Sequence, residues 1–121
     1  MKKKLLLISI FIFTTIFHTT AQDAEVLWYK IATLNGHNNI VLSVAWHPTD
    51  KKLLASSSWD ETIKIWNIYK KTDKQCIATL KEHTDRVYSV AWHPKIPSLL
   101  ASASWDKTIK IWDLYNEPGK Q

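Results

Sequence analysis

Residues 58–67 read Ser-Trp-Asp-Glu-Thr-Ile-Lys-Ile-Trp-Asn, and residues 104–113 repeat them almost unchanged as Ser-Trp-Asp-Lys-Thr-Ile-Lys-Ile-Trp-Asp. Sliding the sequence against itself by 46 positions aligns residues 31–75 with residues 77–121, and 27 of the 45 aligned pairs are identical. A repeat period of about 40 to 50 residues is typical of β-propeller blades and of helical arrays. The local pattern within each copy decides between these two architectures.

Each copy consists of short runs rich in β-branched and aromatic residues, which have the length of strands rather than helices. Pro48 and Pro94 end the first run of each copy, because proline cannot donate a hydrogen bond to a sheet. Asp60-Glu61 and Asp106-Lys107 form links short enough for tight hairpins. The pattern predicts an all-β chain with four strands per unit. The predicted strands are Lys30–Leu34, Val41–Trp46, Leu53–Trp59, Thr62–Ile68, Cys76–Leu80, Val87–Trp92, Leu99–Trp105 and Thr108–Leu114.

Several motifs then resemble the WD40 repeat family. Asn-Gly-His at 35–37 is similar to its Gly-His element, and Ile-Trp-Asn at 65–67 and Ile-Trp-Asp at 111–113 are similar to its Trp-Asp element. The Ser-Trp-Asp-x-Thr turns at 58–62 and 104–108 also resemble the family, and the resemblance covers roughly residues 27–115. The second copy departs from the pattern with Glu82, where the family favours glycine.

The resemblance implies two four-stranded propeller blades, an incomplete propeller unless the chain oligomerises or belongs to a longer one. It also implies a hydrogen-bond network of Asp, His, Ser and Trp across each blade. Ser56 is expected opposite Trp66, with Ser58 as the alternative. The implied network residues are His37, Ser56, Asp60 and Trp66 in the first copy and His83, Ser102, Asp106 and Trp112 in the second.

The same Ser, His and Asp residue types occur in hydrolase triads, but the sequence has no Gly-x-Ser-x-Gly elbow and the serine is expected inside a strand. His47 and His93 each stand alone beside a proline, which favours a strand-ending turn over a zinc site. Two glycines cannot form a phosphate-binding loop. We expect no enzymatic activity, no cofactor and no metal. Cys76, the single cysteine, is expected to be a buried small apolar residue.

The N-terminus has the pattern of a secretory signal. Lys2 to Lys4 precede an apolar run at residues 5–17, which is too short for a membrane span of about 20 residues. We expect cleavage after Ala21 and export of the protein, which would then be secreted or periplasmic. The alternative is a membrane anchor at residues 5–17. Removing residues 1–21 leaves 13 basic and 11 acidic residues, a net charge of +2 that disfavours nucleic-acid binding.

The strand count predicts how copies of the chain assemble. The expected segments are a signal peptide at 1–21, an outer strand at 22–34, a first repeat at 35–80, a second repeat without its last strand at 81–115, and a tail at 116–121. The spare N-terminal strand of one copy would complete the last blade of the next copy. Three or four copies would then close a ring. The alternative is that the chain is a fragment of a longer propeller.

The leading predicted function is a non-enzymatic scaffold that presents its propeller faces to a partner protein. Tryptophan, tyrosine and arginine are enriched at protein interfaces. The predicted partner-binding residues are Ile40, Leu42, Trp59, Arg86, Tyr88 and Trp105. The family resemblance also suggests intracellular adaptors of iron-sulfur assembly or peroxisomal import, as relatives of the longer propeller in the fragment alternative.

Overall fold

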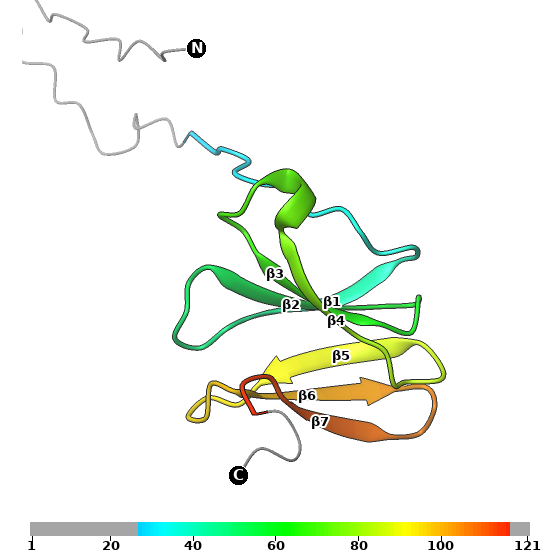
Figure 1. Cartoon of the computed structure of the whole chain (residues 1–121). Coiled ribbons are helices and arrows are strands. Elements are labelled where there is room, and N and C mark those ends of the chain that lie inside the picture. Colours follow the sequence, from blue (N-terminus) through cyan, green and yellow to red (C-terminus); the bar gives the residue numbers. More distant parts are fainter. Residues whose placement is uncertain (1–26, 117–121) are drawn as a thin grey trace, which may run out of the picture.

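The computed structural model describes residues 27–116, which form two antiparallel sheets (Figure 1). The first sheet has the strand order β1-β2-β3-β4 and the second has the order β5-β6-β7. The strands are β1 (Val41–Trp46), β2 (Leu53–Ser58), β3 (Ile63–Asn67), β4 (Cys76–Leu80), β5 (Val87–Trp92), β6 (Leu99–Ser104) and β7 (Ile109–Asp113). A 3-10 turn (Thr72–Lys74) precedes β4. The prediction of an all-β chain with two blades of an incomplete propeller is confirmed, and within residues 27–116 the first blade has four strands and the second has three.

Tight turns join the middle strands of both sheets at the repeated Asp-x-Thr sequence. Glu61 and Lys107 have φ values of 67° and 69°, in the left-handed region that L-residues adopt at some cost. The Asp60 carboxylate compensates by accepting a hydrogen bond from the Thr62 amide at 3.0 Å. Asp106 accepts the equivalent bond from Thr108 at 2.9 Å. The aspartate of each repeat therefore stabilises its own turn.

A β-bulge interrupts the first strand of each sheet. The register shifts between Val41 and Ser43 against β2, and between Val87 and Ser89 against β6. Leu42 and Tyr88 are the extra residues at these bulges. Because a bulge bends its strand and redirects the side chain, it sets where these two residues point.

The two sheets pack face to face, with the main core between them (Figure 1). Ala55, Ile63 and Ile65 contribute from the first sheet, and Val87, Val90 and Leu100 contribute from the second. The Trp92 indole donates a hydrogen bond to the Ala45 carbonyl oxygen at 3.1 Å and so ties β5 to β1. The second sheet is thus held by apolar contact and by a directional bond.

His47 and His93 lie in the turns after β1 and β5. Each Nδ1 accepts a hydrogen bond from the backbone amide three residues later in the chain. The donor is Asp50 for His47 and Ile96 for His93, both at 2.9 Å. His47 is buried, and its Nε2 lies 2.9 Å from the carbonyl oxygen of Pro97 in the β5–β6 loop of the other blade. His47 therefore ends its strand, as expected, and also joins the two blades.

The N-terminal segment from residue 27 to residue 40 contains no strand in the single chain. Leu34 lines a groove together with Val41, Val44 and Leu54 on the first sheet. The outer strand expected at 22–34 requires a neighbouring blade, so it stays a prediction. Residues 22–26, the signal sequence expected at 1–21 and the tail from residue 117 lie outside the described residues.

Ser57 provides a test of packing between the sheets. Its side chain is fully buried, and its hydroxyl has no hydrogen-bond partner within residues 27–116. The equivalent residue of the second repeat is Ala103. We expect Ser57→Ala to raise the free energy of unfolding by about 1 kcal/mol, because it removes an unpaired buried hydroxyl.

Urea denaturation measures this change, and Ser56→Ala is the matched control. Ser56 accepts the Trp66 indole, so its loss should lower the free energy of unfolding by about 1 to 3 kcal/mol. Equal destabilisation by both variants would contradict the assignment of Ser57.

Candidate functional site

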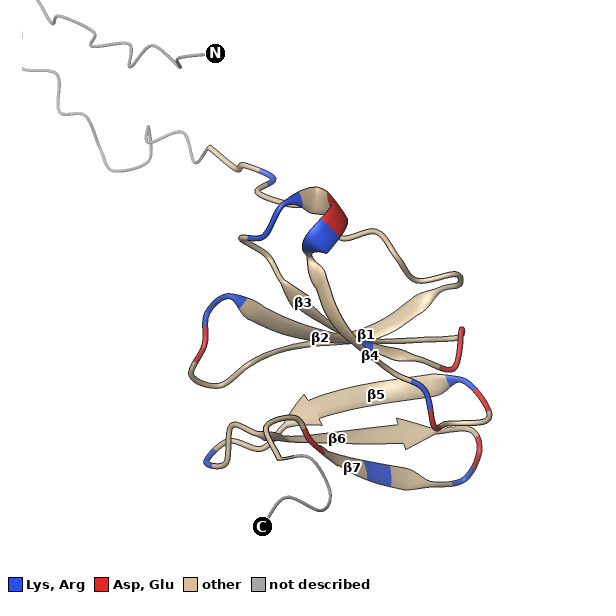
Figure 2. Cartoon of the chain, in the orientation of Figure 1, with Lys and Arg blue, Asp and Glu red and all other residues tan. Residues whose placement is uncertain are grey.

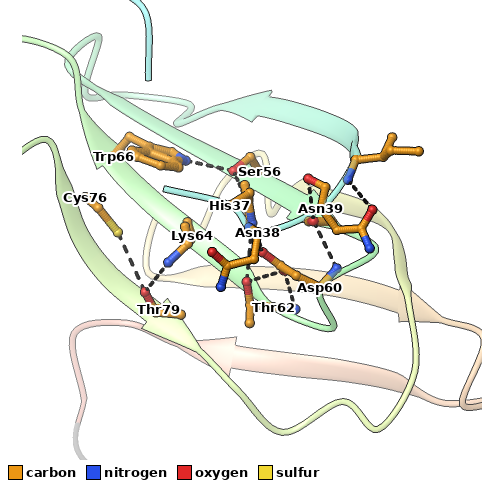
Figure 3. A network of polar contacts seen from close by, with 12 residues as sticks. His37, Asn38, Asn39, Ser56, Asp60, Thr62, Lys64, Trp66, Cys76 and Thr79 are labelled. Carbon is orange, nitrogen blue, oxygen red and sulfur yellow. Dashed lines mark hydrogen bonds and ion pairs between the residues drawn. The ribbon is translucent and has the colours of Figure 1, made fainter. Parts of the chain in front are cut away.

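A chain of hydrogen bonds crosses the first sheet (Figure 3). The Trp66 indole donates to the Ser56 hydroxyl at 2.7 Å. Ser56 and His37 Nε2 are 2.7 Å apart, and His37 Nδ1 lies 2.8 Å from Asp60 Oδ2. The hydroxyl of Ser56 donates to Nε2 when Nδ1 carries the proton and donates to Asp60. Every polar group in this chain then has a partner, which a buried network requires to be stabilising.

Asp60 is the acceptor at the end of the chain. Burial alone would raise the pKa of its carboxyl group, but hydrogen bonds from Thr62, Asn38 and His37 outweigh that effect and hold the pKa well below its usual value. The shortest bond is from the Thr62 hydroxyl at 2.6 Å, and the Asn38 amide lies at 2.9 Å. The carboxylate therefore stays charged at neutral pH and links the loop at residue 38 to the β2–β3 turn.

The second sheet repeats the network. Trp112 donates to Ser102 at 2.9 Å, Ser102 lies 2.8 Å from His83, and His83 lies 2.6 Å from Asp106. Burial would raise the pKa of Asp106, but the bonds from Thr108, His83 and the Thr84 amide lower it well below its ordinary value. The same geometry therefore arises twice from the same residue types.

Ser56, and not Ser58, occupies the network position. Ser58 instead donates from its hydroxyl to the Asn39 carbonyl at 3.3 Å and accepts the Asp60 amide at 3.0 Å. Ser56 and Ser102 are only 4% and 2% exposed. A hydroxyl buried to this degree and held by a tryptophan is not placed to attack a substrate.

The loops that carry the two histidines differ in sequence. Gly36 has a φ of +152°, and a Cβ atom there would lie 3.2 Å from Cη2 of Trp66. Glu82 holds the equivalent position, and it is not among the positive-φ residues of the described chain. The second loop therefore reaches the same His83 geometry by a different backbone path.

A second group of residues lies at the sheet ends next to the Asp60 and Asp106 turns. We call Trp59, Arg86, Tyr88 and Trp105 the rim cluster. The Arg86 guanidinium carbon lies 4.0 Å from the centre of the Trp59 ring and 4.8 Å from that of Trp105. Tyr88 stacks on Trp105 with ring centres 5.7 Å apart and planes at 12°. Arg86 thus contacts a tryptophan from each blade.

Backbone bonds position both tryptophans of the rim cluster. The Trp59 amide donates to the Ile40 carbonyl at 2.9 Å, and the Trp105 amide donates to the Arg86 carbonyl at 3.0 Å. Trp105 is 53% exposed and Ile40 is 55% exposed. Leu42 lies at the bulge of β1 and is partly buried. Of the predicted partner-binding residues, the structure connects Trp59, Arg86, Trp105 and Tyr88, each through contact with the next.

Sequence reasoning placed these residues near one surface but missed the contact between Arg86 and both tryptophans. That contact joins residues from different repeats, so spacing within one repeat gives no signal for it. Sequence reasoning also missed the bond from His47 to Pro97, for the same reason.

Three further features of the described chain concern metal binding, membrane spanning and the single cysteine. Residues 27–116 contain no cluster of three or more His, Cys, Asp or Glu side chains suited to a metal ion. None of their helical turns is long and apolar enough to cross a bilayer. Cys76 is partly rather than fully buried, because it lies in the outer strand β4, and its Sγ is 3.6 Å from the Thr79 hydroxyl.

The lowered pKa of Asp60 predicts acid sensitivity. An unfolded aspartate titrates near pH 4, whereas the folded carboxyl group titrates well below that. Its contribution to stability is therefore present above about pH 4 and is lost as the pH falls toward the folded pKa. We expect the free energy of unfolding to fall between pH 5 and pH 2, measured by urea denaturation.

The variant Asp60→Asn should lower the free energy of unfolding by about 1 to 3 kcal/mol at pH 7 and should flatten its decline in acid. Asp73→Asn, in the exposed 3-10 turn, is the control and should keep the wild-type profile. An unchanged acid profile in Asp60→Asn would remove Asp60 as a source of the effect.

Comparisons with known proteins agree with this architecture. Three relatives illustrate the different kinds of protein that this chain resembles. A Ribosome biogenesis protein WDR12 homolog of Trichoplax adhaerens is 50% identical over 36 residues, 30% of this chain and 8% of that protein. The Coronin-like protein crn1 of Schizosaccharomyces pombe is 50% identical over 42 residues, 35% of this chain and 7% of its own length. Coatomer subunit beta'-1 of Arabidopsis thaliana is 41% identical over 46 residues, 38% of this chain and 5% of its own length.

The aligned part of the chain thus spans less than a tenth of each of these relatives. The family described as WD domain, G-beta repeat matches residues 28–67, which contain β1 to β3, and residues 74–113, which contain β4 to β7. Both matches contain the network serine and tryptophan of their own blade. The chain therefore belongs to the WD40 repeat family.

Proposed function

We propose that this protein is a non-enzymatic scaffold that binds a partner protein through the rim cluster. The observation that carries the proposal is the position of Arg86 against Trp59 and Trp105. A guanidinium stacked on aromatic rings is held in place before a partner arrives, so less side-chain freedom is lost on binding. Arginine, tryptophan and tyrosine are also the residues that contribute most at protein interfaces.

The chemistry of the rim cluster favours a partner segment with an apolar side chain next to a carboxylate. Trp105 and Tyr88 offer exposed aromatic surface. Arg86 can offer the edge of its guanidinium to a carboxylate while its face stays on the rings. One of the relatives is a subunit of coatomer, and so by its name part of a larger assembly, which supports a binding role.

Other classes of function find less support. The net charge of +2 after residue 21 is weak for nucleic-acid binding. The buried Ser56 and Ser102 do not favour catalysis.

We propose that the working assembly is a homo-oligomer of three or four chains. The alternative, two blades of a longer propeller, is separated from it by the assembly experiment below.

We also propose that the protein is exported after cleavage behind Ala21, with an uncleaved anchor at residues 5–17 as the alternative. The support is the basic start and the short apolar run of the sequence. Expression of the full chain followed by N-terminal sequencing of the purified protein tests this. A mature N-terminus at Gln22 is expected, and an intact Met1 on a membrane-bound protein would favour the anchor.

The rim cluster is tested by quantitative affinity capture from cells that make the protein. We expect Arg86→Ala and Trp105→Ala each to reduce recovery of specific partners at least tenfold. Tyr69→Ala is the control, because Tyr69 is a 72% exposed aromatic residue after β3, at the opposite end of that strand from the Trp59 turn. Circular dichroism should show an unchanged fold in all three variants. Equal recovery by the wild type and the rim variants would refute this role.

A further inference from the structure

The two outer faces of the blade pair have the same residues as the two faces that pack together inside it. Ile63 and Ile65 of β3 are 0% and 2% exposed against the second sheet, whereas their equivalents Ile109 and Ile111 are 73% and 63% exposed. These residues form the open face of the second blade, together with Ala91 and Ala101, the equivalents of Ala45 and Ala55. Figure 2 shows that most charged residues lie in loops and turns, which leaves the strands largely uncharged.

The opposite face of the first blade carries the complementary set. Val87 and Val90 are 0% and 5% exposed in the packed interface, whereas their equivalents Val41 and Val44 are 47% and 61% exposed. Leu54 and Trp46 are the identical equivalents of Leu100 and Trp92. One open face therefore has the residues of one side of the internal interface, and the other open face has those of the other side.

The outer edge of β7 matches a strand partner elsewhere in the chain. Within the first sheet, β3 pairs with β4 through Ile63 with Leu80, Lys64 with Thr79, and Ile65 with Ala78. Residues 109–112 are identical to residues 63–66, and residues 31–34 are identical to residues 77–80. Within residues 27–116, β7 has a strand partner on one side only.

Residues 31–34 lie at the open face of the first blade, where β7 of a neighbouring copy would come to lie. Leu80 of β4 packs against the core that contains Val90 and Leu100 of the following blade. Leu34 lines a groove with Val44 and Leu54, the equivalents of these two residues. The N-terminal segment thus lies against the first blade much as β4 lies against the second.

We propose that the open faces bind a second copy of this chain, head to tail, and that residues 31–34 of one copy pair with β7 of the next. The register is Ile109 with Leu34, Lys110 with Thr33, and Ile111 with Ala32. This inference deepens the homo-oligomer proposed above and does not depend on the rim cluster. Because each contact leaves one face of each type free, copies add until the ring closes.

The register is tested by cross-linking the full-length chain in a Cys76→Ser background. Facing residues of paired strands have Cα atoms about 4.5 to 5.5 Å apart, within the range of a disulfide. We expect Thr33→Cys combined with Lys110→Cys to give disulfide-linked dimers and larger species under mild oxidation on a non-reducing gel. Lys64→Cys with Thr79→Cys, the equivalent pair inside one chain, is the control and should form an intrachain bond, because these residues face each other in the β3–β4 register.

Ala32→Cys combined with Lys110→Cys is the matched negative variant, since a shift of one residue turns the side chain to the other face of the sheet. Little linked product is expected. Absence of linked chains in the Thr33 and Lys110 variant, or equal linkage in both variants, would overturn the proposed register.

The assembly is tested by light scattering after size exclusion. The wild type should have the mass of three or four chains, and Ile109→Glu should reduce it to one chain. Ile96→Glu, the same change at an exposed residue of the β5–β6 loop, should keep the wild-type mass. Trp105→Ala should also keep it, so failure of the rim proposal and failure of this one are distinguishable. A single-chain or polydisperse wild type would overturn the proposal and favour two blades of a longer propeller.

Discussion

A propeller blade has apolar side chains on both faces of one sheet, and each face must be covered. In this chain one face of each blade covers the other, which buries Ile63, Ile65, Val87 and Leu100. Within residues 27–116, the remaining two faces keep the same kinds of side chain without a second sheet against them, and only the segment around Leu34 lies against the first of them. The sheet pair, the bond between Trp92 and Ala45, and the proposed contact between copies all follow from this requirement.

The hydrogen-bond network gives each blade an internal order that apolar packing alone does not provide. It connects a loop before the first strand, the middle of the second and third strands, and the turn between them. Directional bonds of this kind select one arrangement among many of similar apolar burial. The tryptophan beside each turn aspartate is held by its own backbone bond, from Trp59 to Ile40 and from Trp105 to Arg86, so the rim cluster is positioned by these bonds at the ends of the turns.

Much of the fold could be predicted because it depends on local pattern. Three strands, β1, β4 and β5, have the predicted limits. The strands β2 and β6 end one residue earlier than predicted, and β3 and β7 begin one residue later and end one residue earlier. The run at Lys30–Leu34 is not a strand in the single chain. The choice of Ser56 over Ser58 followed from the short turn at Asp60, which was expected to bring Ser56 opposite Trp66; in the observed register Ser56 faces Lys64, and Trp66 reaches Ser56 from the next position but one. The bulges at Leu42 and Tyr88 gave no such signal, because a bulge depends on how two strands fit.

The sequence by itself determined the repeat, the strands and the turns, since these depend on residue spacing within about 46 positions, and its resemblance to the WD40 family implied the members of each blade network. Only the tertiary structure decided which faces pack together, that Arg86 lies between tryptophans of two blades, and that His47 reaches Pro97. The physical reason is that these contacts join residues from different repeats, and their geometry depends on how one sheet lies on the other.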